Sequence, residues 1–203
     1  MSESWLALRD ADRDLALCLL FSPAAGRAVL ADRLHLALEA ETAVRVTSEP
    51  MLAAIRLQWW VDSIEQRRHE SVPLMRRLLV HIEHGRLDKD AVLAQMALWQ
   101  ERLADDRISA GSCWRDLFTM LAERAERRDA AGYVGMAMGD QSVADRIDAA
   151  SLAVLRDRRH YWIWMAGQVT RYRISRRMSG AVRDNDPLLI WRMLGWRLGI
   201  RLP

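Results

Sequence analysis

The residues with the clearest potential for chemistry are a few carboxylates and histidines. Asp10 and Asp14 are four residues apart, a spacing that places two carboxylates on one face of a helix, where they could hold a divalent cation. His81 and His84 are three residues apart with Glu83 between them, but the nearby sequence offers no third metal ligand. We therefore interpret the aspartates as first-turn acids that complement a helix dipole, and the histidines as the surface end of a helix.

Two cysteines, Cys18 and Cys113, stand alone in apolar surroundings without metal-ligand spacing. They are predicted to be small buried hydrophobic residues rather than a disulfide, which indicates a reducing compartment. A nucleophile–base pair of Cys113 with His160 has no local motif to support it.

Arginine and aromatic side chains alternate in the last quarter of the chain. Residues 156–203 carry 11 basic and 3 acidic side chains, a balance of +8, whereas residues 1–155 carry 19 and 24, a balance of −5. The candidate partner or membrane surface consists of Arg171, Arg173, Arg176, Arg177, Trp191 and Trp196, with Trp162 and Trp164 as further anchors. Such interleaving suits an anionic lipid surface or an acidic protein face, and an ordinary solvated basic face is the alternative. Nucleic acid is disfavoured because no binding motif accompanies the charge.

Helical periodicity indicates the elements that would position these residues. Apolar residues recur at i, i+3 or i+4, and i+7 around Trp60, Trp99 and Trp114. Ser22 and Ser71 are candidate helix caps, each with a proline close behind. Helices are expected near 3–20, 23–46, 49–68, 72–84, 88–106, 112–130, 141–180 and 187–200. The sequence predicts one all-α domain over residues 1–203 with about seven or eight helices.

The most specific signature lies in residues 48–64, which read SEPMLAAIRLQWWVDSI. This string resembles the SEPxLxxIRLQWWxDxI segment of the squalene/phytoene synthase family, in particular the bacterial branch related to mitochondrial complex I assembly factors. Residues 12–16 and 20–23 resemble the opening of that family, and residues 187–192 resemble its closing stretch. The likeness is concentrated in residues 10–125, and we expect a shortened, degenerate member.

The resemblance implies an isoprenoid-synthase-like helical bundle around an apolar cavity, in which two DxxxD motifs hold Mg²⁺ on a prenyl diphosphate. This chain departs from that pattern. At the first motif Glu41 is followed four residues later by Arg45, so an ordinary helical ion pair is preferred to a remnant metal ligand. At the second motif Asp145 and Asp148 are three apart, and we interpret them as an acid-rich helix start rather than a metal site.

The nine tryptophans have two interpretations. Trp59, Trp60, Trp99 and Trp114 lie on periodic apolar faces, for which packing in the core is preferred to the lining of a prenyl-sized cavity. We expect Trp59 and Trp60 to lie on a helix, with at least one of them largely buried.

These features favour a non-catalytic or reduced squalene/phytoene synthase-like protein that acts as an assembly or accessory factor, or as a subunit, at a membrane surface. Its expected partner is a protein, a membrane complex, an anionic lipid or a prenyl (isoprenoid) lipid, and no cofactor is expected. The alternative is a Mg²⁺-dependent enzyme that joins two prenyl diphosphates head to head, with Glu41 and Asp145 or Asp148 as remnant ligands. No stretch approaches about 18 uncharged apolar residues, and the charged N-terminus is unlike a signal peptide, so we expect a cytoplasmic protein peripheral to the inner membrane.

Overall fold

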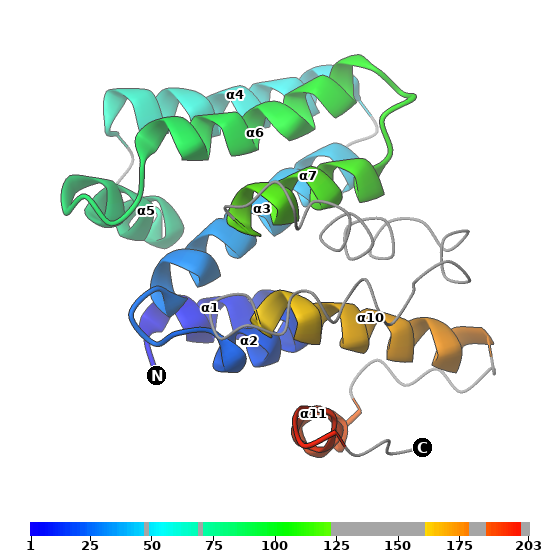
Figure 1. Ribbon diagram of the computed structural model, residues 1–203. Helices are drawn as coiled ribbons and strands as arrows, with labels where there is room; N and C mark the ends of the chain where they lie inside the picture. Colours follow the sequence, from blue (N-terminus) through cyan, green and yellow to red (C-terminus); the bar gives the residue numbers. More distant parts are fainter. Residues whose placement is uncertain (47–48, 69–70, 123–160, 179–185, 200–203) are drawn as a thin grey trace.

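The chain folds into α-helices throughout the part described by the computed structural model, which covers residues 1–46, 49–68, 71–122, 161–178 and 186–199 (Figure 1). Within these ranges there is no β-strand, which confirms the predicted all-α class. The helices are α1 (Glu3–Ala11), α2 (Arg13–Cys18), the short 3-10 helix η1 (Leu19–Phe21), α3 (Arg27–Val46), α4 (Pro50–Gln66), α5 (Pro73–Glu83), α6 (Lys89–Ala104), α7 (Ala110–Ala122), α10 (Tyr161–Met178) and α11 (Leu189–Arg197).

The N-terminal segment forms two helices where one was predicted over residues 3–20. Asp12 adopts an extended conformation, with φ −148° and ψ 101°, between α1 and α2. Its carboxylate accepts the backbone N–H groups of Asp14 and Leu15, each at 3.0 Å, and so caps α2. Asp14 is a first-turn acid as predicted, but Asp10 lies in the last turn of α1 and pairs with Arg9. The aspartates therefore serve different helix ends.

Neither predicted serine cap is present, and a proline marks the start of α5. Pro73 is the first residue of α5, and the capping position before it is Val72, which makes no side-chain capping bond. Ser22 Oγ donates to the carbonyl of Leu19 at 2.8 Å, and α3 begins only at Arg27. Proline suits the first helical position because the N–H that it lacks would have no partner within the helix.

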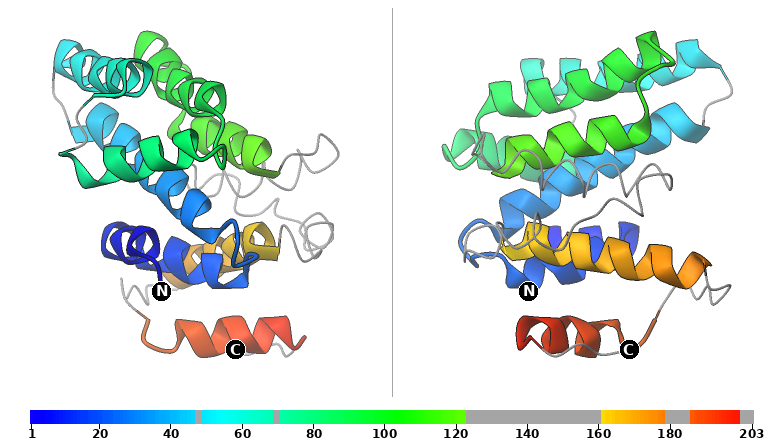
Figure 2. Two further views of the ribbon diagram at one scale, coloured as in Figure 1. Left: turned by 90° about the vertical axis from the view of Figure 1, so that its left-hand side faces the viewer. Right: turned by 45° about the vertical axis from the view of Figure 1, so that its right-hand side comes forward.

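Helix α3 is the central element of the fold. It contacts α1, η1, α4, α5 and α6. Helices α4 and α6 lie side by side at one end of the molecule, and α1, α2 and α10 lie together at the other end (Figures 1 and 2). Helix α11 lies beyond α10, on the side away from α4 and α6 (Figure 2). The described helices share one connected cluster of buried apolar side chains.

A row of aromatic rings crosses this core from α6 through α7 to α10. The ring centroids are 6.0 Å apart for Trp99 and Trp114, 6.1 Å for Trp114 and Phe118, and 5.6 Å for Phe118 and Trp162. Each of the four side chains is at most 1% exposed. The prediction that Trp99 and Trp114 pack in the core is confirmed.

Residues 50–64 of the signature segment lie in α4. Leu57 and Ile64 are buried, Trp60 is 7% exposed, and Trp59 is half-buried with its ring edge-on to Trp60 at 5.0 Å. The prediction that these tryptophans lie on a helix with at least one buried is confirmed.

Candidate functional site

Glu41 does not form the predicted pair with Arg45. Its Oε2 atom accepts the indole N–H of Trp114 at 3.0 Å, which joins α3 to α7. Arg45 is exposed at the end of α3, and the described residues contain no ion pair between it and Glu41. Because Trp114 is 1% exposed, its indole N–H would otherwise be buried without an acceptor. One oxygen of this carboxylate therefore has a structural role.

The second candidate acid site, Asp145 and Asp148, lies outside the described residues, as does His160. Within the described ranges, no group of three or more histidine, cysteine, aspartate or glutamate side chains is placed to hold a metal ion.

The sequence interpretation missed a buried polar network centred on Asp32 of α3. This carboxylate is 0% exposed. It accepts Ser4 Oγ at 2.7 Å and Arg77 Nε at 2.8 Å, and His81 Nε2 lies 3.1 Å from it. Arg77 also pairs with Glu3 at 3.2 Å. The network joins α1, α3 and α5 around one negative charge.

The geometry of this network corrects the expectation that His81 lies at the surface, since the residue is only 6% exposed. His84 is exposed, and its Nδ1 atom lies 2.7 Å from the carbonyl of Val80. Ser4 donates to the carboxylate and not to the imidazole, so the two side chains do not form a serine–histidine pair of the kind that activates a nucleophile. We interpret the network as structural, because Arg77 neutralises a carboxylate that has no access to water.

Neither thiol is a candidate nucleophile. Cys18 and Cys113 are free and buried, which confirms their prediction as buried residues without a disulfide. Burial raises the pKa of Cys113 to about 11 and that of Cys18 well above its ordinary value, so both are protonated at neutral pH.

The predicted basic surface on α10 is partly engaged in packing. Arg173 forms an ion pair with Asp14 of α2, whose pKa is raised by burial and lowered in turn by this arginine. Arg176 lies over the ring of Tyr172 at 5.7 Å. Arg171 is half-buried, and the side chain of Arg177 lies outside the described residues.

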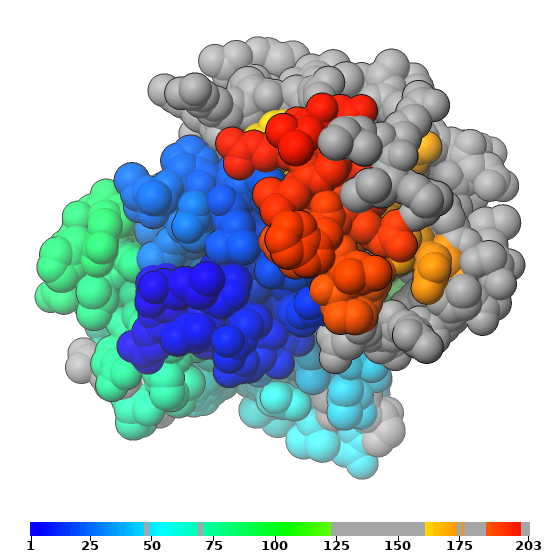
Figure 3. Space-filling view, turned by 90° about the horizontal axis from the view of Figure 1, so that it is seen from below, coloured from blue at the N-terminus to red at the C-terminus, as the bar shows by residue number. Residues whose placement is uncertain are grey.

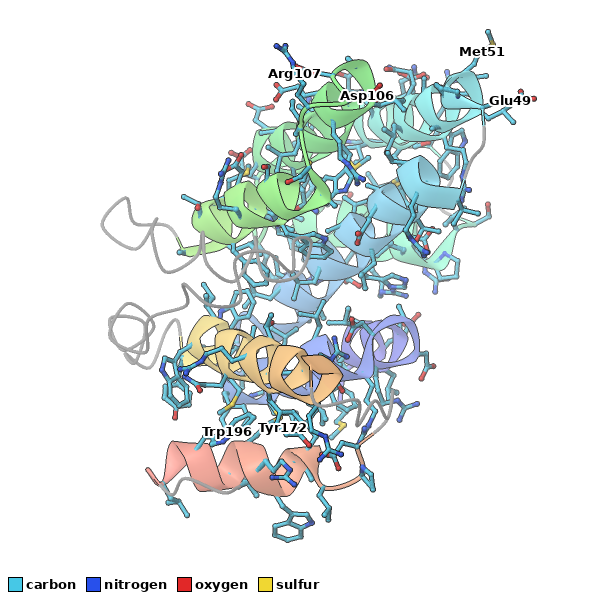
Figure 4. All side chains as sticks on the ribbon, turned by 90° about the vertical axis from the view of Figure 1, so that its right-hand side faces the viewer. Glu49, Met51, Asp106, Arg107, Tyr172 and Trp196 are labelled. Carbon is cyan, nitrogen blue, oxygen red and sulfur yellow. The ribbon has the colours of Figure 1, made fainter. Side chains whose placement is uncertain are left out.

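The predicted tryptophan anchors divide into buried and exposed side chains. Trp162 and Trp164 are 1% and 7% exposed, so the prediction that they contact a membrane is wrong. Trp196 is half-buried and packs on Tyr172, with the ring centroids 6.0 Å apart (Figure 4). Trp191 is 65% exposed and is the one member of this set that is available to a partner.

Trp191 belongs to an exposed apolar row, here called the α11 stripe, which consists of Leu188, Trp191, Leu194 and Leu198. The exposed fractions of these side chains are 55%, 65%, 38% and 75%. Spacings of three, three and four residues place them on one side of the helix, while Leu189 and Met193 are buried on the other side. Figure 3 shows side chains of α11 at the surface of the face seen from below. Arg197 is exposed next to the stripe.

A second apolar surface lies between α4 and α6. This groove, of about 630 Å³, is lined by Pro50, Met51, Ala54, Ile55, Gln58, Gln100, Leu103 and Ala104. Met51 and Ile55 are 73% and 57% exposed. Glu49 and Asp106 lie at the same end of the molecule as Met51 (Figure 4).

Comparisons of the chain with models of protein families, with curated proteins and with solved structures find no match. The resemblance at residues 48–64 therefore stays a prediction. None of the described helices is both long enough and apolar enough to cross a membrane.

Proposed function

We propose that the protein is a non-catalytic or reduced relative of the squalene/phytoene synthases that works as an assembly or accessory factor at a membrane surface, and that the α11 stripe makes the membrane contact. The observation that carries this proposal is the exposure of Trp191 and its leucine neighbours next to arginine. The signature in α4 and the all-helical fold support an isoprenoid-synthase-like bundle.

The charge next to the stripe suits an anionic membrane. Arg197 is exposed there, whereas Arg173 and Arg192 pair with Asp14 and Asp186. Each arginine near an anionic bilayer contributes about 1 kcal/mol to the free energy of membrane binding. Each leucine or similar side chain that becomes fully buried contributes about 1.5–3 kcal/mol. Helix α11 has nine residues and a length of ~13 Å, too short to cross a hydrocarbon core of ~30 Å, so it would lie in the plane of the interface.

The state of Glu41 supports a non-catalytic role. The resemblance implies paired carboxylates that hold Mg²⁺ against a diphosphate, and here one oxygen of the single glutamate already accepts the indole N–H of Trp114. Arg45 stands where the second carboxylate would be and would repel a cation.

We expect the protein to sediment with vesicles that contain anionic lipid, and to do so less at high salt. Replacing Trp191 and Leu198 together with serine should weaken vesicle binding about 100-fold, because two apolar contacts of ~1.5 kcal/mol each are removed. Both side chains are exposed in the free protein, so circular dichroism should show the same helix content in the double variant.

A matched control is the double variant Leu6→Ser with Val80→Ser, which removes two apolar side chains that are 38% exposed on α1 and α5. This control should bind anionic vesicles as the parent does. Equal binding by the Trp191 and Leu198 variant, or no binding by the parent, would rule out the membrane contact.

The enzymatic alternative is tested separately. We expect no product from farnesyl or geranylgeranyl diphosphate in the presence of Mg²⁺, measured by extraction and chromatography of radiolabelled prenyl products. Product that disappears in Glu41→Gln, while the variant keeps its circular dichroism spectrum, would replace the proposed function with a prenyltransferase.

A further inference from the structure

We propose that the α4/α6 groove of one copy of this protein binds the α11 stripe of a second copy, in a head-to-tail contact. This inference goes beyond the proposed membrane contact, and each can fail without the other. It starts from two exposed apolar features of the described residues, the stripe and the groove.

The dimensions of the two surfaces match. The α4 wall of the groove runs from Pro50 to Gln58, which is ~12 Å along a helix. The nine residues of α11 span ~13 Å. Apolar residues at i, i+3, i+6 and i+10 form the kind of row that an amphipathic helix inserts into an apolar groove.

The charges around the two surfaces are opposite. Residues 49–66 and 100–107, which include the groove lining, contain six acidic and three basic side chains. Glu49, Glu101 and Asp106 are exposed there. Helix α11 contains two arginines and no acidic residue, and Arg197 is exposed next to the stripe. An arginine-bearing helix therefore suits this groove better than an acidic or neutral one, and the chain itself carries such a helix.

The fold prevents a chain from filling its own groove. Helices α4 and α6 lie at one end of the molecule and α11 lies at the other, with α3, α1 and α10 between them (Figures 1 and 2). The contact must therefore be intermolecular, and because it joins two different surfaces, each dimer leaves one stripe and one groove open. Association should continue beyond the dimer unless a ring closes.

The contact is expected to be weak. Eight lining residues are fewer than the roughly 20–30 residues per side of a stable interface. Association should therefore depend on concentration and decrease with salt. Anionic vesicles should compete with it, because both would cover the α11 stripe.

The experiment is sedimentation velocity of the full chain over a concentration series that reaches about 1 mM, the range suited to weak interfaces. The sedimentation coefficient of the parent should rise with concentration. Ile55→Glu, which changes the groove, and Trp191→Glu, which changes the stripe, should each remain at the monomer value. Leu6→Glu, at an exposed leucine outside both surfaces, should behave as the parent does.

Mixing the two variants is the decisive step. Trp191→Glu retains its groove and Ile55→Glu retains its stripe, so an equimolar mixture should form a dimer and nothing larger. A parent that stays monomeric throughout, a variant that associates as the parent does, or a mixture without dimer would each overturn the proposal. Vesicle binding separates the outcomes, because Ile55→Glu should keep it and Trp191→Glu should lose it.

Discussion

Replacing Asp32 with alanine is expected to lower the free energy of unfolding by about 3–5 kcal/mol, because it leaves buried cationic and polar groups without their acceptor. Arg77, whose side chain is 10% exposed, would lose the carboxylate 2.8 Å from its Nε atom. Ser4 and His81 would lose the same partner. Since domains have about 5–15 kcal/mol of stability in total, a urea titration followed by circular dichroism should show a large shift of the midpoint.

The control is Asp10→Ala. Asp10 is also paired with an arginine, but its side chain is 69% exposed. Its replacement should therefore lower the free energy of unfolding by less than about 0.5 kcal/mol. In the double variant with Asp32→Ala and Arg77→Ala, the free energy of unfolding should fall by less than the sum of the two single effects. The second change removes the unpaired charge that the first one leaves. A parent-like unfolding midpoint in Asp32→Ala would show that the network contributes little.

Apolar periodicity predicted most of the described fold because burial repeats with the helical turn. The buried positions Leu57, Trp60 and Ile64 could be identified from spacing alone. Helix ends were harder to predict. Periodicity continues across Asp12, and the break depends on a carboxylate that turns back to two backbone N–H groups. A serine before a proline does not reveal whether its hydroxyl will cap the next helix or, as at Ser22, bond to the preceding turn.

The Asp32 network could not be predicted because its partners come from three helices that are distant in sequence. Ser4 is 28 positions from Asp32, Arg77 is 45 and His81 is 49. An aspartate in a helical segment looks the same in sequence whether it faces water or the core. The clearest available signal was the histidine at position 81, whose spacing from Leu74 and Leu78 places it on the apolar side of α5.

The candidate basic surface was predicted as a region but not residue by residue. A charge count locates the excess of arginine, yet it does not distinguish Arg173, which pairs with Asp14, from Arg197, which is exposed. Tryptophan likewise suits a core as well as an interface, and only the packing of α10 and α11 assigns each ring. The assignments of Asp145 and Asp148 stay predictions, since both residues lie outside the described ranges.

Trp162→Ala and Trp191→Ala are expected to have opposite effects on folding and on membrane binding. Trp162 is 1% exposed, and its ring centroid lies 5.6 Å from that of Phe118. Its truncation leaves a cavity and should lower the free energy of unfolding by about 3–5 kcal/mol. Trp191 is 65% exposed, and its truncation should change the free energy of unfolding by less than about 0.5 kcal/mol. Urea unfolding of the two variants and the parent gives both numbers.

The same pair of variants separates the core tryptophan from the interfacial one in a vesicle assay. Trp191→Ala removes an aromatic side chain that already faces water, so its whole apolar contribution is available to a bilayer, and binding to anionic vesicles should fall about tenfold or more. Trp162→Ala, measured where it remains folded, should bind as the parent does, because no part of its ring reaches the surface in the native protein. If instead both variants lose binding equally while folded, the membrane contact involves α10, and the α11 stripe is not the anchor.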